Sequence, residues 1–195
     1  EAFHPYHVFV NAGFRVDFAS PKGGAIPLDP YSDPRQPTSM VKGDRVVDEF
    51  LADKDCMQRF NNSATLASVK TENYAAVFVA GGNGAIFDLA NDLHLKRILE
   101  ETARDSTKTL ATVCHGSASL IQLRNADGTP FVQGLRVTGF DNVEEGIAGA
   151  QIGVSYLPFF LETELRKLGA VFQNAAPFQS YTTVDLNGRF VCGQQ

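Results

Sequence analysis

The chain has 195 residues, a formal net charge of −5 and an apolar share of 44%. This length is typical of one domain with a packed core. Its basic residues are scattered and no apolar run approaches the roughly 18 residues that span a bilayer, which argues against nucleic-acid binding and against a membrane span. The three cysteines, Cys56, Cys114 and Cys192, are widely spaced. That pattern argues against a disulfide framework or a zinc site and favours a reducing compartment, so we expect a cytoplasmic protein.

The first part of the chain alternates helical and extended patterns around one long loop. Apolar spacing and turn residues predict a helix over 1–12, a strand over 14–19, a loop over 20–43, a helix over 46–60 and a buried strand over 74–80. The helix over 1–12 should end at Gly13 and bury Phe3, Tyr6 and Val10.

The alternation continues to the end of the chain. We expect helices over 93–103 and 158–168, a strand over 108–113, a helix from there to about 123, a strand or hairpin over 131–139, a helical turn over 143–146, and strands over 170–173 and 189–192. Helices that alternate with strands predict an α/β fold with a mainly parallel sheet.

The most informative stretch is the strand that ends at Cys114, with His115 and Gly116 directly after it. A strand, a sharp turn and a helix in this order resemble a nucleophile elbow, which exposes the side chain at the turn. Amides at the start of a helix favour the thiolate, the reactive form of cysteine. The alternative is a buried, inert cysteine at the end of a core strand.

A second turn that could bind a ligand follows the strand over 74–80. Gly81, Gly82 and Asn83 begin it, and glycines let backbone N–H groups approach a ligand closely. Carboxyl ends of neighbouring parallel strands meet at one edge of a sheet, so amides near Gly82 and His115 could hold an oxyanion beside Cys114. A phosphate site is the weaker interpretation, because the spacing is not G-x-G-x-x-G.

Taken together, these motifs resemble the ThiJ/PfpI superfamily, and within it the heat-shock glyoxalase III group. The resemblance covers essentially the whole chain. It rests on the ordered segments Phe18–Pro21, Pro27–Pro30, Ala80–Gly84, Ala111–Gly116, Gly134–Phe140 with Glu144 and Glu145, and Leu157–Glu162. Two positions depart from the pattern of many members: Asn83 stands where histidine is common, and Ser117 where proline is common.

The resemblance implies a flavodoxin-like three-layer α/β sandwich that is usually a homodimer. It also implies that Cys114 works with His115 and with a glutamate that maps onto Glu1. The implied reaction converts methylglyoxal, a small aldehyde, to lactate through a hemithioacetal on Cys114. It needs no cofactor or metal. Residue patterns alone would make Glu1 only a terminal charge.

Related domains begin with a strand before this glutamate and usually end with a further helix. We therefore expect residues 1–195 to form a single ThiJ/PfpI-like domain that lacks its first strand and last helix.

The residue patterns leave three alternative interpretations of the function open. The first is a stress-response holdase chaperone, or a sensor that uses oxidation of Cys114 without turnover. The second is a thiol-dependent hydrolase or isonitrile hydratase. The third adds a metal to Glu1, His4 and His7, although Glu1 and His7 would lie about 120° apart on a helix, which suits one ion poorly.

Overall fold

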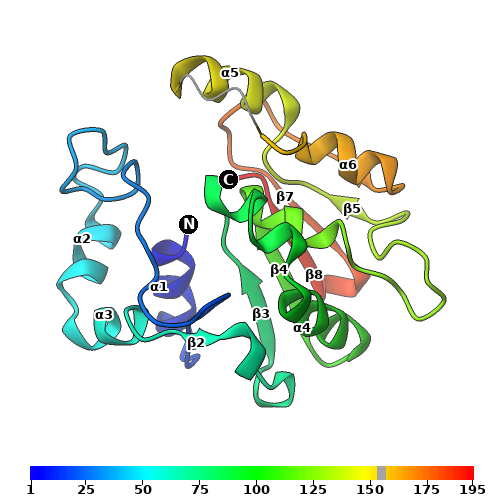
Figure 1. Ribbon diagram of the computed structural model, residues 1–195, viewed down its shortest axis with the longest axis horizontal. Coiled ribbons are helices and arrows are strands. Elements are labelled where there is room, and N and C mark those ends of the chain that lie inside the picture. Colours follow the sequence, from blue (N-terminus) through cyan, green and yellow to red (C-terminus); the bar gives the residue numbers. More distant parts are fainter. Residues whose placement is uncertain (153–156) are drawn as a thin grey trace. The chain divides into compact units, whose positions relative to one another are not determined.

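The computed structural model describes residues 1–152 and 157–195 (Figure 1). Its contacts divide the chain into two units, Glu1–Val69 and Lys70–Gln195. We still expect these units to belong to a single ThiJ/PfpI-like domain that lacks its first strand and last helix, and this expectation is not tested by the division.

The first unit consists of three helices and two very short strands. They are α1 (Phe3–Asn11), β1 (Ala19–Ser20), α2 (Arg45–Ala52), α3 (Lys54–Phe60) and β2 (Ala64–Thr65), with a 3-10 turn η1 (Leu66–Ser68) at the end. β1 and β2 pair in parallel. The core of this unit is aromatic: the Phe3 ring stacks on Phe50 with centroids 3.7 Å apart, and the Phe60 ring meets Phe3 edge-on at 5.5 Å. Such pairs add to the stabilisation that apolar burial already provides.

The structure corrects three expectations in this unit. The helix predicted over 46–60 is two helices, because Asp53 has an extended ψ of 105° and its carboxylate accepts a hydrogen bond from Cys56 N, capping α3. The strand predicted over 14–19 is reduced to a pairing at Ala19 and Ser20. Val10, predicted to be buried, is 41% exposed, whereas Phe3 is buried as expected.

The predicted loop over 20–43 contains an internal ion pair. The Arg35 guanidinium donates to both oxygens of Asp33, at 2.7 and 2.8 Å, and the Arg35 backbone N–H also donates to Asp33. These hydrogen bonds from Arg35 hold the pKa of the Asp33 carboxyl at about 2, below its usual value. The pair therefore favours the folded loop only while Asp33 is ionised.

Asp33→Asn should lower stability in a pH-dependent way. The folded pKa is about 2 and an unfolded Asp titrates near 3.9, so the contribution is present above about pH 4 and is lost as the pH falls towards 2. We expect the difference in Tm between wild type and Asp33→Asn to be constant from pH 7 to 5 and to shrink below pH 4. A difference that does not depend on pH would contradict this origin.

The second unit contains the main sheet. In chain order it comprises η2 (Thr71–Asn73), β3 (Ala76–Val79), η3 (Asn83–Ile86), η4 (Leu89–Asn91), α4 (Leu93–Arg104), β4 (Thr109–Val113), η5 (Cys114–Leu120), β5 (Arg136–Val137), α5 (Asn142–Ile152), α6 (Leu161–Lys167), β6 (Val171–Phe172), β7 (Thr182–Asp185), η6 (Leu186–Gly188) and β8 (Phe190–Gly193). The sheet order is β3-β4-β8-β7, with β5 and β6 as a separate parallel pair. Only β7 runs antiparallel to its neighbour in that sheet.

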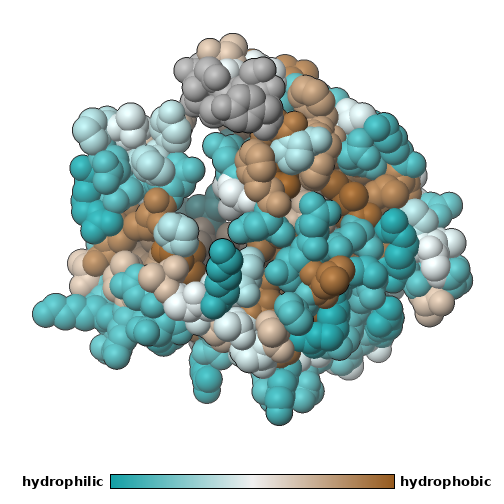
Figure 2. Space-filling model, viewed as in Figure 1, coloured by the Kyte–Doolittle hydropathy of each residue, from teal (hydrophilic) through white to brown (hydrophobic). Residues whose placement is uncertain are grey.

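This arrangement confirms the predicted flavodoxin-like α/β fold with a mainly parallel sheet. β4 lies between β3 and β8, and α4 packs on β3 and β4 (Figure 1). The inner side of α4 buries Leu95, Ile98 and Leu99, and Asp92 caps its start. Its charged residues form i,i+4 ion pairs, and hydrophilic side chains dominate the region of α4 in Figure 2. The central strand β4, at whose end the elbow lies, is therefore hydrogen-bonded along both edges, to β3 and to β8.

Several boundaries differ from expectation. The segment after Cys114 is a 3-10 helix rather than an α-helix, and the helical turn expected over 143–146 is the longer helix α5. The helix predicted from 158 begins at Leu161. β7 was not predicted at all. Within the described residues, no helix is long and apolar enough to cross a bilayer.

Candidate active site

The elbow forms where β4 ends. Cys114 follows Val113 directly and has a φ of +53°, in the left-handed region that non-glycine residues rarely adopt. Backbone in this region costs on the order of 1–3 kcal/mol and persists only where its surroundings enforce it. The side chain is 5% exposed. The sequence thus places a strained, nearly buried thiol at the carboxyl end of the central strand.

Close backbone packing enforces this turn. A Cβ on Gly116 would lie 2.6 Å from the carbonyl oxygen of Val79 and 2.7 Å from that of Ala80. The Ser117 hydroxyl donates to Thr138 O at 3.0 Å and lies 2.7 Å from Thr112 Oγ1. The start of η5 is therefore held against the end of β3 and against the strand that precedes it.

Gly116→Ala is expected to destabilise the protein by about 1–3 kcal/mol, because the atoms that the new methyl group meets belong to the backbone and cannot rotate away. The measurement is the Tm in thermal unfolding, which should fall by several degrees. Gly146→Ala is the matched control. This exposed glycine in α5 has no atom of the described residues within 4 Å of an added Cβ, so alanine there should be neutral or stabilising. Equal Tm values for the two variants would contradict the packing argument.

His115 lies between the thiol and a carboxylate. Its Nδ1 is 3.6 Å from Cys114 Sγ, and its Nε2 is 2.5 Å from Glu145 Oε1. His115 is 2% exposed and Glu145 is 7% exposed, so this hydrogen bond is shielded from water and strengthened by the low dielectric. A carboxylate acceptor favours the tautomer that carries the proton on Nε2. Nδ1 is then the acceptor that faces the sulfur.

The three residues therefore form a Cys-His-Glu relay. The imidazole can take the thiol proton at Nδ1, and Glu145 can stabilise the imidazolium that results. The Phe140 ring lies 4.6 Å from the imidazole and covers it, and Val113 and Phe78 belong to the same apolar cluster. The other two cysteines differ, since burial raises the pKa of both, that of Cys192 to about 11. No disulfide joins the three cysteines, all of which lie in the described part of the chain.

The structure brings Cys114 and His115, both predicted site residues, into contact, while their catalytic role stays a prediction. Glu145 was missed as a site residue. It lies 30 positions from His115 along the chain, on a helix expected only as a short turn. The one available signal was its place in the Glu144–Glu145 segment of the family resemblance.

The glycine turn lies beside the elbow in the same unit. Gly81 and Gly82 follow β3, Gly82 has a φ of +89°, and Asn83 begins η3, which packs against η5. This places the predicted segment next to the predicted thiol. The oxyanion role of its amides stays a prediction.

Glu1, His4 and His7 belong to the first unit. Glu1 is exposed and precedes α1. His4 Nε2 lies 2.8 Å from Asp44 Oδ2, and His7 Nε2 lies 2.8 Å from the Asn11 amide nitrogen. Over residues 1–152 and 157–195, no group of three or more His, Cys, Asp or Glu side chains is arranged to hold a metal ion.

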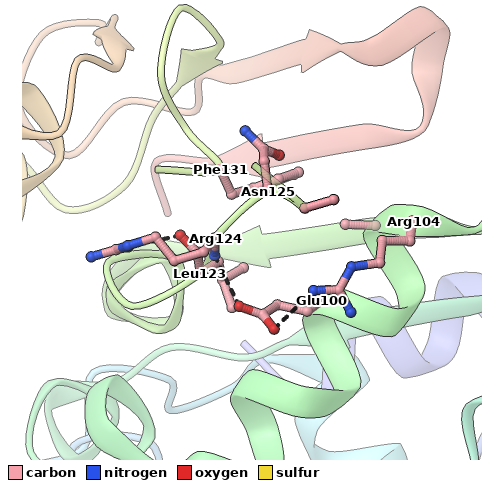
Figure 3. Close-up of a pocket in the computed structure, with 8 residues that line it drawn as sticks. Glu100, Arg104, Leu123, Arg124, Asn125 and Phe131 are labelled. Atoms are coloured by element: carbon pink, nitrogen blue, oxygen red, sulfur yellow. Dashed lines mark hydrogen bonds and ion pairs between the residues drawn. The ribbon is translucent and has the colours of Figure 1, made fainter. Parts of the chain in front are cut away.

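A cavity of about 120 Å³ lies elsewhere in the second unit, between α4 and the segment after η5. Figure 3 shows the Glu100 carboxylate there, which accepts hydrogen bonds from the Arg124 backbone N–H at 2.9 Å and the Arg104 guanidinium at 3.2 Å. The carboxylate therefore forms an ion pair with Arg104 and holds the Arg124 backbone, while the Arg124 guanidinium donates to Ile121 O and Leu123 O. None of the predicted site residues lines this cavity.

A thiol at a strained strand-to-helix turn, next to a buried His–Glu couple on a mainly parallel sheet, has the geometry of the nucleophile-elbow class of α/β proteins. The pattern of the DJ-1/PfpI family matches residues 1–157, and the chain belongs to this family.

Particular relatives match over nearly the full chain. The chain is 29% identical over 196 residues to the glutathione-independent glyoxalase HSP31 of Saccharomyces cerevisiae, a match that covers 99% of this chain and 80% of that protein. It is 28% identical over 206 residues to glyoxalase 3 of Candida albicans, with the same coverages, 99% and 80%. Among solved structures, rapid encystment protein 24 kDa of Francisella tularensis superposes with a TM-score of 0.87 at 30% identity, over 100% of this chain and 80% of that one.

Proposed function

We propose that this protein is a cofactor-independent glyoxalase III-type enzyme that converts methylglyoxal and water to lactate. The observation that carries the proposal is the contact of Cys114 Sγ with His115 Nδ1, whose ring is held at Nε2 by Glu145. The relatives named glyoxalase support the choice of a small 2-oxoaldehyde as substrate.

The proposed reaction begins when the Cys114 thiolate adds to the aldehyde carbon of methylglyoxal. The product is a hemithioacetal whose oxygen would be held by amides near Gly82 and His115. A base removes the proton from this carbon to give an enediol, and a proton returned to the neighbouring carbon gives a lactoyl thioester. We assign these transfers to His115, with Glu1 as a second candidate.

Hydrolysis of the thioester by water releases lactate and restores the thiol. One carbon of the substrate is oxidised while its neighbour is reduced, so the sequence balances without an external oxidant. The homodimer and the cytoplasmic location remain parts of this proposal, and light scattering of the purified protein would test the first.

The test is an assay of the purified protein with methylglyoxal in buffer that lacks glutathione. We expect one lactate to form for each methylglyoxal consumed. Protein whose Cys114 has been alkylated with iodoacetamide should form none. Loss of methylglyoxal without lactate would instead indicate a covalent trap or another reaction, and would overturn the proposal.

A further inference from the structure

A second carboxylate lies directly before Glu145 and has no part in the proposed chemistry. Glu144 is fully buried. Its Oε2 accepts a hydrogen bond from Asp141 N at 2.9 Å, and its Oε1 accepts from Phe178 N at 2.8 Å, Gln194 Nε2 at 2.8 Å and Gln195 Nε2 at 2.6 Å. All four of these donors are amides. A buried charge is costly unless it is hydrogen-bonded, so this carboxylate constrains every group that satisfies it.

One set of these bonds defines where α5 begins. Asp141 Oδ1 accepts from Val143 N at 2.8 Å and from Glu144 N at 2.9 Å, while Glu144 returns a bond to Asp141 N. This reciprocal arrangement is a capping box, in which two side chains satisfy the free amides of the first helical turn. Asp141 Oδ2 also accepts from the Asn174 amide at 2.7 Å. The start of α5, and with it the position of Glu145, therefore depends on Glu144.

Another of these bonds holds the aromatic side of the site. Phe178 has a φ of +61°, and its N–H donates to Glu144. Its ring lies 6.2 Å from that of Phe140, which in turn lies 4.6 Å from the imidazole of His115. A left-handed phenylalanine is strained and needs an external restraint, which the Glu144 carboxylate provides.

We propose that Glu144 is a positioning residue for this site. Its carboxylate fixes Glu145 against Nε2 of His115 and fixes Phe178 behind Phe140. Together these two restraints keep Nδ1 directed at Cys114. Among the described residues, the ionisable groups that meet at the imidazole are Cys114 and Glu145, with Asp141 and Glu144 behind them at the start of α5.

The test compares Glu144→Gln with Glu162→Gln. Glu162 Oε2 accepts from Asn142 N at 3.0 Å, so the control makes the same chemical change at the same helix end without touching Phe178 or the glutamines. In Glu144→Gln the side-chain NH₂ group replaces one carboxylate oxygen and faces at least one N–H donor, so that hydrogen bond is lost. The first readout is the pH dependence of Cys114 alkylation by iodoacetamide, followed on the Cys114 peptide by mass spectrometry, which needs no assumption about the substrate.

We expect Glu144→Gln to move the alkylation profile by about half a pH unit or more, and Glu162→Gln to leave it unchanged. With methylglyoxal, kcat should fall about 10–100-fold with little change in KM, because a small misplacement of the imidazole affects the chemical step more than binding. This turnover readout rests on the proposed function. Alkylation and turnover that match those of Glu162→Gln would overturn the inference.

Phe178→Gly decides the question if Glu144→Gln does not fold. Glycine accepts the positive φ without strain, which offsets part of the stability lost with the ring, so the variant should fold while the ring behind Phe140 is removed. We expect the alkylation profile to move in this variant as well, and an unchanged profile would contradict the aromatic restraint. A wild-type protein with no turnover of methylglyoxal would contradict only the proposed function, because alkylation still tests the positioning role.

Discussion

Cys114→Ser is expected to lower lactate formation from methylglyoxal by about 10³-fold or more, with an unchanged Tm. Serine has the same shape as cysteine with a smaller terminal atom, so it should fit the same left-handed turn. The hydroxyl, however, is far less acidic than the thiol and is not ionised by an imidazole acceptor alone. Loss of a nucleophile commonly removes nearly all of the covalent pathway. The measurement is kcat by direct lactate determination.

Cys192→Ser is the matched control for this variant. Cys192 is fully buried on β8, where burial raises its pKa to about 11, so its thiol stays protonated at neutral pH. Thr112 Oγ1 donates to its sulfur at 3.4 Å, and a serine oxygen could accept that bond. Turnover should therefore be close to that of wild type. Full activity in Cys114→Ser, or equal losses in both variants, would rule out Cys114 as the nucleophile.

The Cys114→Ser variant also separates the enzyme from the stress-protein alternative. A holdase whose activity does not depend on the thiol would protect an aggregating client protein equally well as wild type and as Cys114→Ser, whereas lactate formation would be lost in the variant. Client protection that is lost together with turnover would link both activities to Cys114.

Glu145→Gln is expected to lower kcat about 10²–10⁴-fold while the thiol remains in place. Its carboxylate accepts a hydrogen bond from the Nε2–H of His115. An amide that donates to Nε2 would move the imidazole proton to Nδ1, the atom that faces the sulfur. The base would then be blocked, as in other triads where a carboxylate is replaced by its amide. The measurement is kcat across pH 5–9.

Glu162→Gln again provides the control, since its carboxylate contacts the start of α5 but not His115. Glu145→Gln should retain the wild-type Tm within a few degrees, because an amide can still hydrogen-bond the ring. Turnover within about threefold of wild type would show that the imidazole needs no carboxylate, and would remove Glu145 from the mechanism.

Local signals predicted the elbow and the central strand well. The apolar run before Cys114, followed by His115 and Gly116, predicts a strand and a sharp turn from neighbouring residues alone, although packing on Val79 and Ala80 enforces the turn. Helix α4 was equally predictable, because its apolar period buries Leu95, Ile98 and Leu99 on one side. The family resemblance added the reaction, which periodicity alone could not have indicated.

Features that depend on distant contacts were harder to predict. Glu145 acquires its importance only because its side chain on α5 meets His115 of η5 in the folded chain. β7 is a short, partly exposed strand that is stabilised mainly by its pairing with β8. Its own residues therefore predict it weakly. The break at Asp53 was missed because apolar spacing continues through it, although aspartate is a favoured N-cap.

The packing of Gly116 on the carbonyl oxygens of Val79 and Ala80 has an evolutionary consequence. The glycine turn begins at Gly81, directly after Ala80, so the backbone of that turn and the backbone that carries the thiol are packed together. A mutation that changes the conformation of the turn would therefore also move the sulfur. Adaptation to larger or smaller aldehydes should therefore leave Gly116 and its two carbonyl contacts in place and occur at side chains that hold neither the elbow nor His115. Libraries aimed at new substrates should keep this backbone contact unchanged.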